Sequence, residues 1–106
     1  MPKFLIKASY TPEGIRGLMK EGGTGRRASV QKLLDSVGGK LEAFYFAYGD
    51  ADAYVICDLP DASSGIAVSL TVNASGAVRI STVPLITAEE MDAASKKSVP
   101  YRVPGA

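Results

Sequence analysis

Two neighbouring strand-like segments restrict the fold of this chain more than any other feature of its sequence. Residues 40–48, KLEAFYFAY, and residues 53–59, AYVICDL, are rich in the aromatic and β-branched side chains that favour strands. The segment between them, from Gly49 to Asp52, has the glycine and aspartate composition of a tight hairpin connection. The sequence therefore predicts a β-hairpin near the middle of the chain.

The N-terminal part is predicted to form one strand and two helical segments. Residues 3–9, KFLIKAS, alternate with the period of a strand. Thr11 is suited to cap a short helix, which Gly22 and Gly23 then end. A second helical segment starts at Thr24. Its apolar face follows the i, i+3, i+4, i+7 spacing and consists of Val30, Leu33, Leu34 and Val37.

The C-terminal part is predicted to add a helix, a strand and a final short helix. Pro60 and Asp61 open the first of these helices, and residues 77–83, AVRISTV, have the pattern of a fourth strand. Thr87 caps the final helix, with Glu90 at the capping-box position. The tail, YRVPGA, is expected to be an extended arm.

The resulting order, β-α-β-β-α-β with a terminal helix, predicts an α+β fold of the ferredoxin-like type. In this fold, two helices cover one face of a four-stranded antiparallel sheet. We expect a single domain over residues 1–106, because a chain of this length has room for only one core.

Both faces of the predicted strand at residues 40–48 are largely apolar. Strict alternation places Leu41, Ala43 and Tyr45 on one face and Phe44 and Phe46 on the other. One layer of helices covers only one face, so Phe44 and Phe46 would be exposed unless something else covers them. We therefore expect a homo-oligomer, most simply a dimer, that forms through the sheet.

The composition argues against several classes of function. With 12 basic and 11 acidic side chains, the net charge of +1 provides no field to attract nucleic acid or an anionic membrane. The absence of histidine removes histidine-based triads and most zinc sites, and we expect neither a cofactor nor a metal. Cys57 is the only cysteine, so the chain forms no internal disulfide, which suits a reducing cytosol. No apolar segment near the N-terminus is long enough for a signal peptide. We expect a cytoplasmic protein with no membrane or nucleic-acid partner.

Tyrosines supply most of the candidate ligand-binding residues. Tyr10, Tyr45, Tyr48, Tyr54 and Arg27 are suited to lining a pocket between the sheet and the helices, or at a seam between subunits. The alternative is structural, because tyrosines on sheets also fill cores and interfaces with their hydroxyl groups at the wet edge.

Acidic and glycine-rich segments supply further candidates. Asp50 and Asp52 are suited to binding a ligand or cation, or alternatively to shaping the turn by accepting backbone N–H bonds. Residues 22–27, GGTGRR, place a helix N-terminus beside Arg26 and Arg27, but they lack the ending of a P-loop, and we interpret them as a loop and helix start. Because Cys57 lies in the middle of a strand, we expect it to pack in the core.

Several segments together resemble the GYD-domain proteins, which are small, mostly bacterial proteins of largely undefined biochemical role. The segments that carry the resemblance are SYTPEG, RRASVQKLLDSVGGKLEAFYFAYG, VICDLPD and SGAVRISTVPLITAEEM. The family signature is a glycine, a variable residue, a tyrosine and an aspartate, and here it reads Gly49, Asp50, Ala51, Asp52. The resemblance implies a ferredoxin-like fold with an α/β-barrel type of assembly. It implies no particular chemistry, and Ala51 does not carry over any role of the family tyrosine.

Three functions remain open from the sequence. The leading hypothesis is an oligomeric domain that binds or senses a small, partly apolar molecule, since the sequence contains no strong catalytic constellation and no residue that we assign as catalytic. One alternative is a cofactor-free, oxygenase-like enzyme or a related small dimeric α/β-barrel enzyme, which rests on analogy of fold alone. The other alternative is a structural or regulatory assembly module whose sheet contacts another protein.

Overall fold

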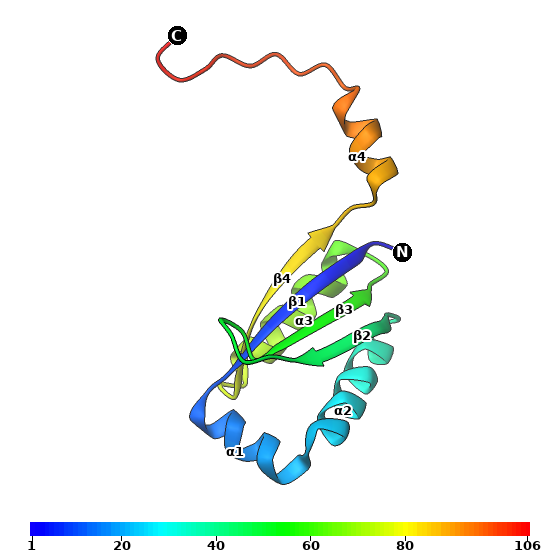
Figure 1. The fold of residues 1–106 in the computed structure, drawn as a ribbon. Coiled ribbons are helices and arrows are strands. Elements are labelled where there is room, and N and C mark those ends of the chain that lie inside the picture. The colour runs from blue at the N-terminus through cyan, green and yellow to red at the C-terminus, as the bar shows by residue number, and fades with distance from the viewer.

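The computed structural model describes residues 1–106, and its elements follow the predicted order (Figure 1). The elements are β1 (Lys3–Tyr10), α1 (Pro12–Glu21), α2 (Gly23–Ser36), β2 (Lys40–Phe46), β3 (Ala53–Asp58), α3 (Ala62–Ala74), β4 (Val78–Leu85) and α4 (Ala88–Ser95). The strands form one antiparallel sheet in the order β2-β3-β1-β4. The predicted α+β ferredoxin-like fold is therefore confirmed, including its short C-terminal helix.

Local sequence signals account for where the elements begin and end. The hydroxyl of Thr11 accepts a hydrogen bond from the amide of Gly14 at 3.2 Å and so caps α1, as predicted. Thr87 and Glu90 form a complete capping box at the start of α4. Gly38 adopts a φ of 77° after α2, a left-handed conformation that glycine reaches without strain and that turns the chain into β2.

The core lies between the sheet and the helices. It is built around six apolar side chains, which are Phe4, Ile6, Leu34, Val55, Cys57 and Leu59. Leu34, Cys57 and Leu59 are completely buried. The thiol therefore packs in the core, as its position in the strand predicted.

The register of β2 differs from the prediction because the strand contains a β-bulge. The pairing with β3 shifts between Leu41 and Ala43, so Glu42 is an extra residue in the ladder. Beyond this bulge, Phe44 and Phe46 lie on the side of the helices, where their rings meet edge to face at 5.0 Å. The predicted placement of Phe44 and Phe46 on the uncovered face was wrong, because an inserted residue reverses the face of every side chain after it.

The face of the sheet that points away from α2 and α3, here called the open face, carries a different set of residues. Ala43 pairs with Ile56, Ile56 with Leu5, and Leu5 with Val83, which makes one apolar row across all four strands. No helix of the chain covers this row (Figure 1). Val83 is 38% exposed.

Charged side chains lie beside the apolar row, on the side where β1 begins. The ammonium group of Lys3 lies 3.0 Å from a carboxylate oxygen of Glu42 and 3.0 Å from one of Asp58. The hydrogen bond to Glu42, followed by that to Asp58, raises the pKa of Lys3. These three charges are therefore paired with one another at the surface, whereas Lys7 and Arg79 on the same face form no ion pair.

The chain after β4 leaves the domain as an arm of residues 86–106 (Figure 1). It consists of α4 and an extended tail, and all of its side chains are exposed. The extended tail agrees with the prediction. No helix of the chain, in the arm or elsewhere, has the length and apolar character needed to cross a membrane.

Candidate functional site

The most enclosed cavity of the chain is small and lies over the middle of the sheet, between α2 and α3. Helix α2 packs on β2 and α3 packs on β4, so the two helices flank opposite edges of the sheet. The cavity between them is lined by 14 residues from all four strands and both helices, and 13 of them are hydrophobic. The space within it that the centre of a water molecule can occupy has a volume of about 40 Å3. Its walls are therefore apolar in nearly every direction.

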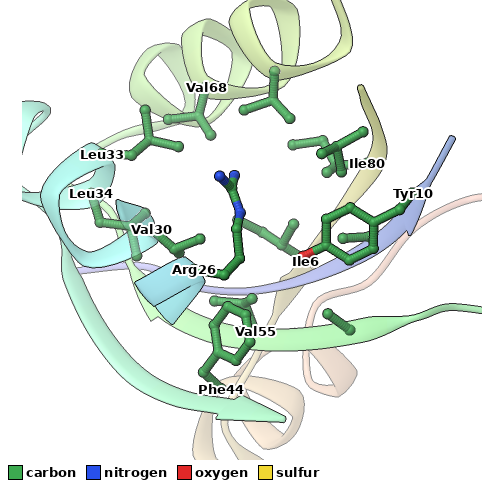
Figure 2. A pocket seen from close by; sticks show the side chains of 14 residues that line it. Ile6, Tyr10, Arg26, Val30, Leu33, Leu34, Phe44, Val55, Val68 and Ile80 are labelled. Carbon is green, nitrogen blue, oxygen red and sulfur yellow. The ribbon is translucent and has the colours of Figure 1, made fainter. Parts of the chain in front are cut away.

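Arg26 of α2 is the one charged residue of the lining. Figure 2 shows its side chain reaching into the middle of the ring of apolar side chains. The side chain is 27% exposed, but its Nε atom is buried and has no hydrogen-bond partner. The cavity therefore combines an apolar wall with one guanidinium group that the chain itself does not fully satisfy.

The register of α2 explains why Arg26 points into the cavity. It precedes Val30 by four residues and Leu34 by eight, and residues with this spacing share one face of a helix. Val30 and Leu34 both line the cavity. The sequence-based interpretation chose the neighbouring Arg27, whereas the structure places Arg27 on the exposed surface of α2 beside Phe46. The spacing from Val30 was the signal that identifies Arg26.

Tyr10 is the only one of the predicted tyrosines that lines the cavity. Its phenol is half-buried at the end of β1, and Figure 2 shows its hydroxyl on the side of the ring that faces Arg26. Burial raises the pKa of Tyr10, while the charge of Arg26 opposes this rise. At neutral pH, Tyr10 therefore contributes a neutral hydroxyl that can donate a hydrogen bond.

The other predicted tyrosines lie elsewhere. Tyr45 and Tyr54 face one another across β2 and β3 on the open face, and Tyr45 is 71% exposed. Tyr48 is fully exposed in the connection between β2 and β3. The structure therefore does not bring the four tyrosines together in one pocket.

The two aspartates have separate surroundings. Asp52 accepts a hydrogen bond from the backbone amide of Tyr10 at 2.8 Å, and its own amide donates to the carbonyl of Ala8 at 2.8 Å. This geometry matches the turn-shaping alternative, and it ties the β2–β3 connection to the end of β1. Asp50 is exposed, and no group of three acidic or cysteine side chains in the chain is placed to hold a metal.

Cys57 is not available as a nucleophile. Its side chain is completely buried, and burial raises its pKa to about 11. The reactive form of cysteine is the thiolate, so the thiol is protonated and unreactive at neutral pH.

A family comparison agrees with this architecture. The model of the GYD domain matches residues 4–95, which reach from the start of β1 to the end of α4. The chain belongs to the GYD domain family. No curated protein matches it. In this GYD domain residues 49–52 form most of the connection from β2 to β3, and Ala51 is only 5% exposed.

The side chains of the lining decide which contacts the cavity of this GYD domain can make. The cavity offers dispersion and apolar contacts, one guanidinium and one phenol. Its lining contains no carboxylate, thiol or histidine side chain.

Proposed function

We propose that this GYD domain binds a small, partly apolar molecule in the cavity between its sheet and its helices, for sensing or for sequestration. The observation that carries the proposal is the lining of the cavity, in which 13 hydrophobic residues surround Arg26 and one of them, Tyr10, adds a phenol hydroxyl beside it. An apolar pocket with a few convergent polar groups is the usual form of a small-molecule site.

The size of the cavity limits the molecule that fits. Its volume of about 40 Å3 exceeds the space that one water molecule needs, which is roughly 10–15 Å3 by the same measure. The space as it stands has room for about three water-sized groups, so a molecule as large as a four-carbon acid enters only when side chains of the lining shift.

Ligand-induced stabilisation tests the proposal. In a thermal-shift screen of compact apolar and amphipathic molecules, we expect at least one compound to raise the unfolding temperature. A ligand present at a hundredfold excess over its dissociation constant stabilises a protein by about 2.7 kcal/mol.

Two variants of opposite effect make the test specific to the cavity. Val30→Phe fills the space and should abolish binding, whereas Val68→Ala enlarges it and should favour longer ligands, since both side chains line the cavity. Met19→Phe, at a position 79% exposed on α1, is the control for adding an aromatic ring. Unchanged binding by Val30→Phe, or no ligand in the whole screen, would contradict the proposal.

We further propose that the open face joins two copies of the chain, which makes the domain a homo-oligomer. The supporting observation is the apolar row of Ala43, Ile56, Leu5 and Val83, which runs across the whole sheet without a covering layer. This row replaces Phe44 and Phe46 as the reason for expecting an oligomer. If the same face instead contacts a different protein, the domain acts as an assembly module.

Size measurements separate these possibilities. We expect the wild-type chain to be a dimer or larger at micromolar concentration, and Leu5→Lys to be a folded monomer. Leu70→Lys is the matched control, because Leu70 lies on α3 at 67% exposure and away from the open face. A monomeric wild-type chain would contradict the homo-oligomer and leave the assembly module as the alternative.

A further inference from the structure

We propose that the cavity is selective for a small organic carboxylate, with Arg26 binding the carboxylate group and the apolar walls binding a short hydrocarbon tail. This inference rests on the proposed function, because it names the chemical class of the molecule that the cavity binds. It is carried by the position of one guanidinium group in otherwise apolar surroundings.

The first step concerns the charge of Arg26. A guanidinium is always protonated in proteins and has donors only, with no acceptor. Its Nε lies in a part of the cavity where Val30, Leu34 and other apolar side chains surround it, and no atom of the chain accepts a hydrogen bond from this nitrogen. A buried donor without a partner destabilises the fold, so an anion that reaches Nε would remove this cost.

The second step concerns Glu21, the one acid of the chain that forms an ion pair with Arg26. The distance from its Oε2 to Nη1 of Arg26 is 3.8 Å, which is too long for a hydrogen bond. Its other oxygen, Oε1, accepts a hydrogen bond from the hydroxyl of Ser29 at 2.8 Å. Glu21 therefore offsets part of the charge through Nη1 and leaves Nε to a molecule inside the cavity.

The third step concerns the shape of the anion. The planar fork of a guanidinium fits the two oxygens of a carboxylate through parallel hydrogen bonds. A phosphate or sulfate group would bring more charge and more acceptor oxygens into walls that supply only one other donor side chain, the phenol of Tyr10. A monoanion with a hydrocarbon tail matches both the donor set and the apolar walls.

Titrations of the 106-residue chain with three small molecules test this inference. Butyrate carries the carboxylate and a short tail, butyramide is its neutral counterpart, and formate is the carboxylate without a tail. Heteronuclear NMR follows the Nε–Hε resonance of Arg26 together with the methyl groups of Val30 and Val68, both of which line the cavity. We expect butyrate to bind about tenfold or more tightly than either other molecule and to shift the Nε–Hε resonance.

Two variants assign the selectivity to one side chain. Arg26→Met keeps an unbranched side chain and removes the charge. This variant should bind butyrate and butyramide with about equal affinity. Arg27→Met is the matched control on the exposed surface of α2 and should retain the full preference. The comparison of the three molecules on the wild-type chain needs no variant, so it stands even if Arg26→Met fails to fold.

The possible outcomes distinguish the two proposals. If butyramide binds in the cavity as tightly as butyrate, the carboxylate inference is overturned while the proposed function stands. If formate binds as tightly as butyrate, or if Arg26→Met keeps the preference, Arg26 and the apolar walls do not act together and the inference is also overturned. If no molecule of this series or of the thermal-shift screen binds, both proposals fail.

Discussion

The two faces of the sheet distribute charge and apolar surface differently. On the open face, Lys3 pairs with two carboxylates at 3.0 Å each, while the apolar row beside them has no cover. On the face covered by helices, the apolar side chains are buried and Arg26 has a buried nitrogen without a partner. A bare apolar row suits contact with another broad surface, whereas a buried, unsatisfied guanidinium nitrogen among apolar walls suits a small anion.

The largest effect should come from a leucine truncation on the covered face. Leu34→Ala removes a completely buried side chain and should lower the free energy of unfolding by about 2–5 kcal/mol. Leu5→Ala on the open face removes the same atoms from a half-buried site and should cost clearly less in a monomer. Urea denaturation measures both. If Leu5→Ala loses as much unfolding free energy as Leu34→Ala, but only at high protein concentration, a second copy of the chain covers Leu5.

Alkaline pH should destabilise the covered face through Cys57. Its pKa is about 11 in the folded chain and 9.0 ordinarily, so stability is complete below pH 9.0 and falls as the pH rises towards about 11. The loss amounts to at most about 2.7 kcal/mol, because one pKa unit corresponds to about 1.36 kcal/mol.

The raised pKa values of Tyr10 and Lys3 act in the same direction, so the contribution of Cys57 must be isolated. Unfolding measured from neutral to alkaline pH for the wild-type chain and for Cys57→Ala supplies the difference. A parallel pH dependence of the two proteins would contradict the role assigned to the buried thiol.

Removing the unsatisfied charge should stabilise the protein by a smaller amount. Arg26→Met replaces a guanidinium among apolar side chains with an apolar side chain, and we expect a gain of about 1 kcal/mol. Arg27→Met, on the exposed surface, should change stability by less than about 0.5 kcal/mol. Calorimetry of both variants measures the difference, and a marked destabilisation by Arg26→Met would mean that Glu21 satisfies the guanidinium better than its distance indicates.

The smallest effect should come from the paired charges on the open face. Lys3→Met breaks both ion pairs with Glu42 and Asp58, but all three side chains are in contact with solvent. We expect a slight loss of stability at low salt that disappears at high salt, because solvent and ions screen exposed pairs. A loss that persists at high salt would indicate that another surface buries this network.

The sequence predicted the elements well and their faces less well. The caps at Thr11 and Thr87 are local signals, and the structure confirms both. The bulge at Glu42 depends on how β2 aligns with β3, which no local pattern encodes, so the faces of Phe44 and Phe46 were assigned wrongly.

The candidate site was predicted only in part, for a similar reason. Tyr10 lines the cavity because β1 extends to it and places it on the face of Ile6 and Ala8, whereas Tyr45 and Tyr54 belong to the other face. Arg26 was interpreted only as part of the loop and helix start at residues 22–27, although its spacing from Val30 and Leu34 places it on their helix face. Composition suggested which residue types could line a pocket. Which side chains line the cavity depends on the direction in which each one points in the folded chain.

The arm of residues 86–106 contributes nothing to the buried interior, because the last buried residue of the chain is Val78. A helix as short as α4, from Ala88 to Ser95, is marginal in water without a packing partner. A fluorophore attached in the arm would therefore leave the core undisturbed and report on encounters with neighbouring molecules. The C-terminus is accordingly the natural attachment point for tethering this domain to a surface or for fusing it to a reporter.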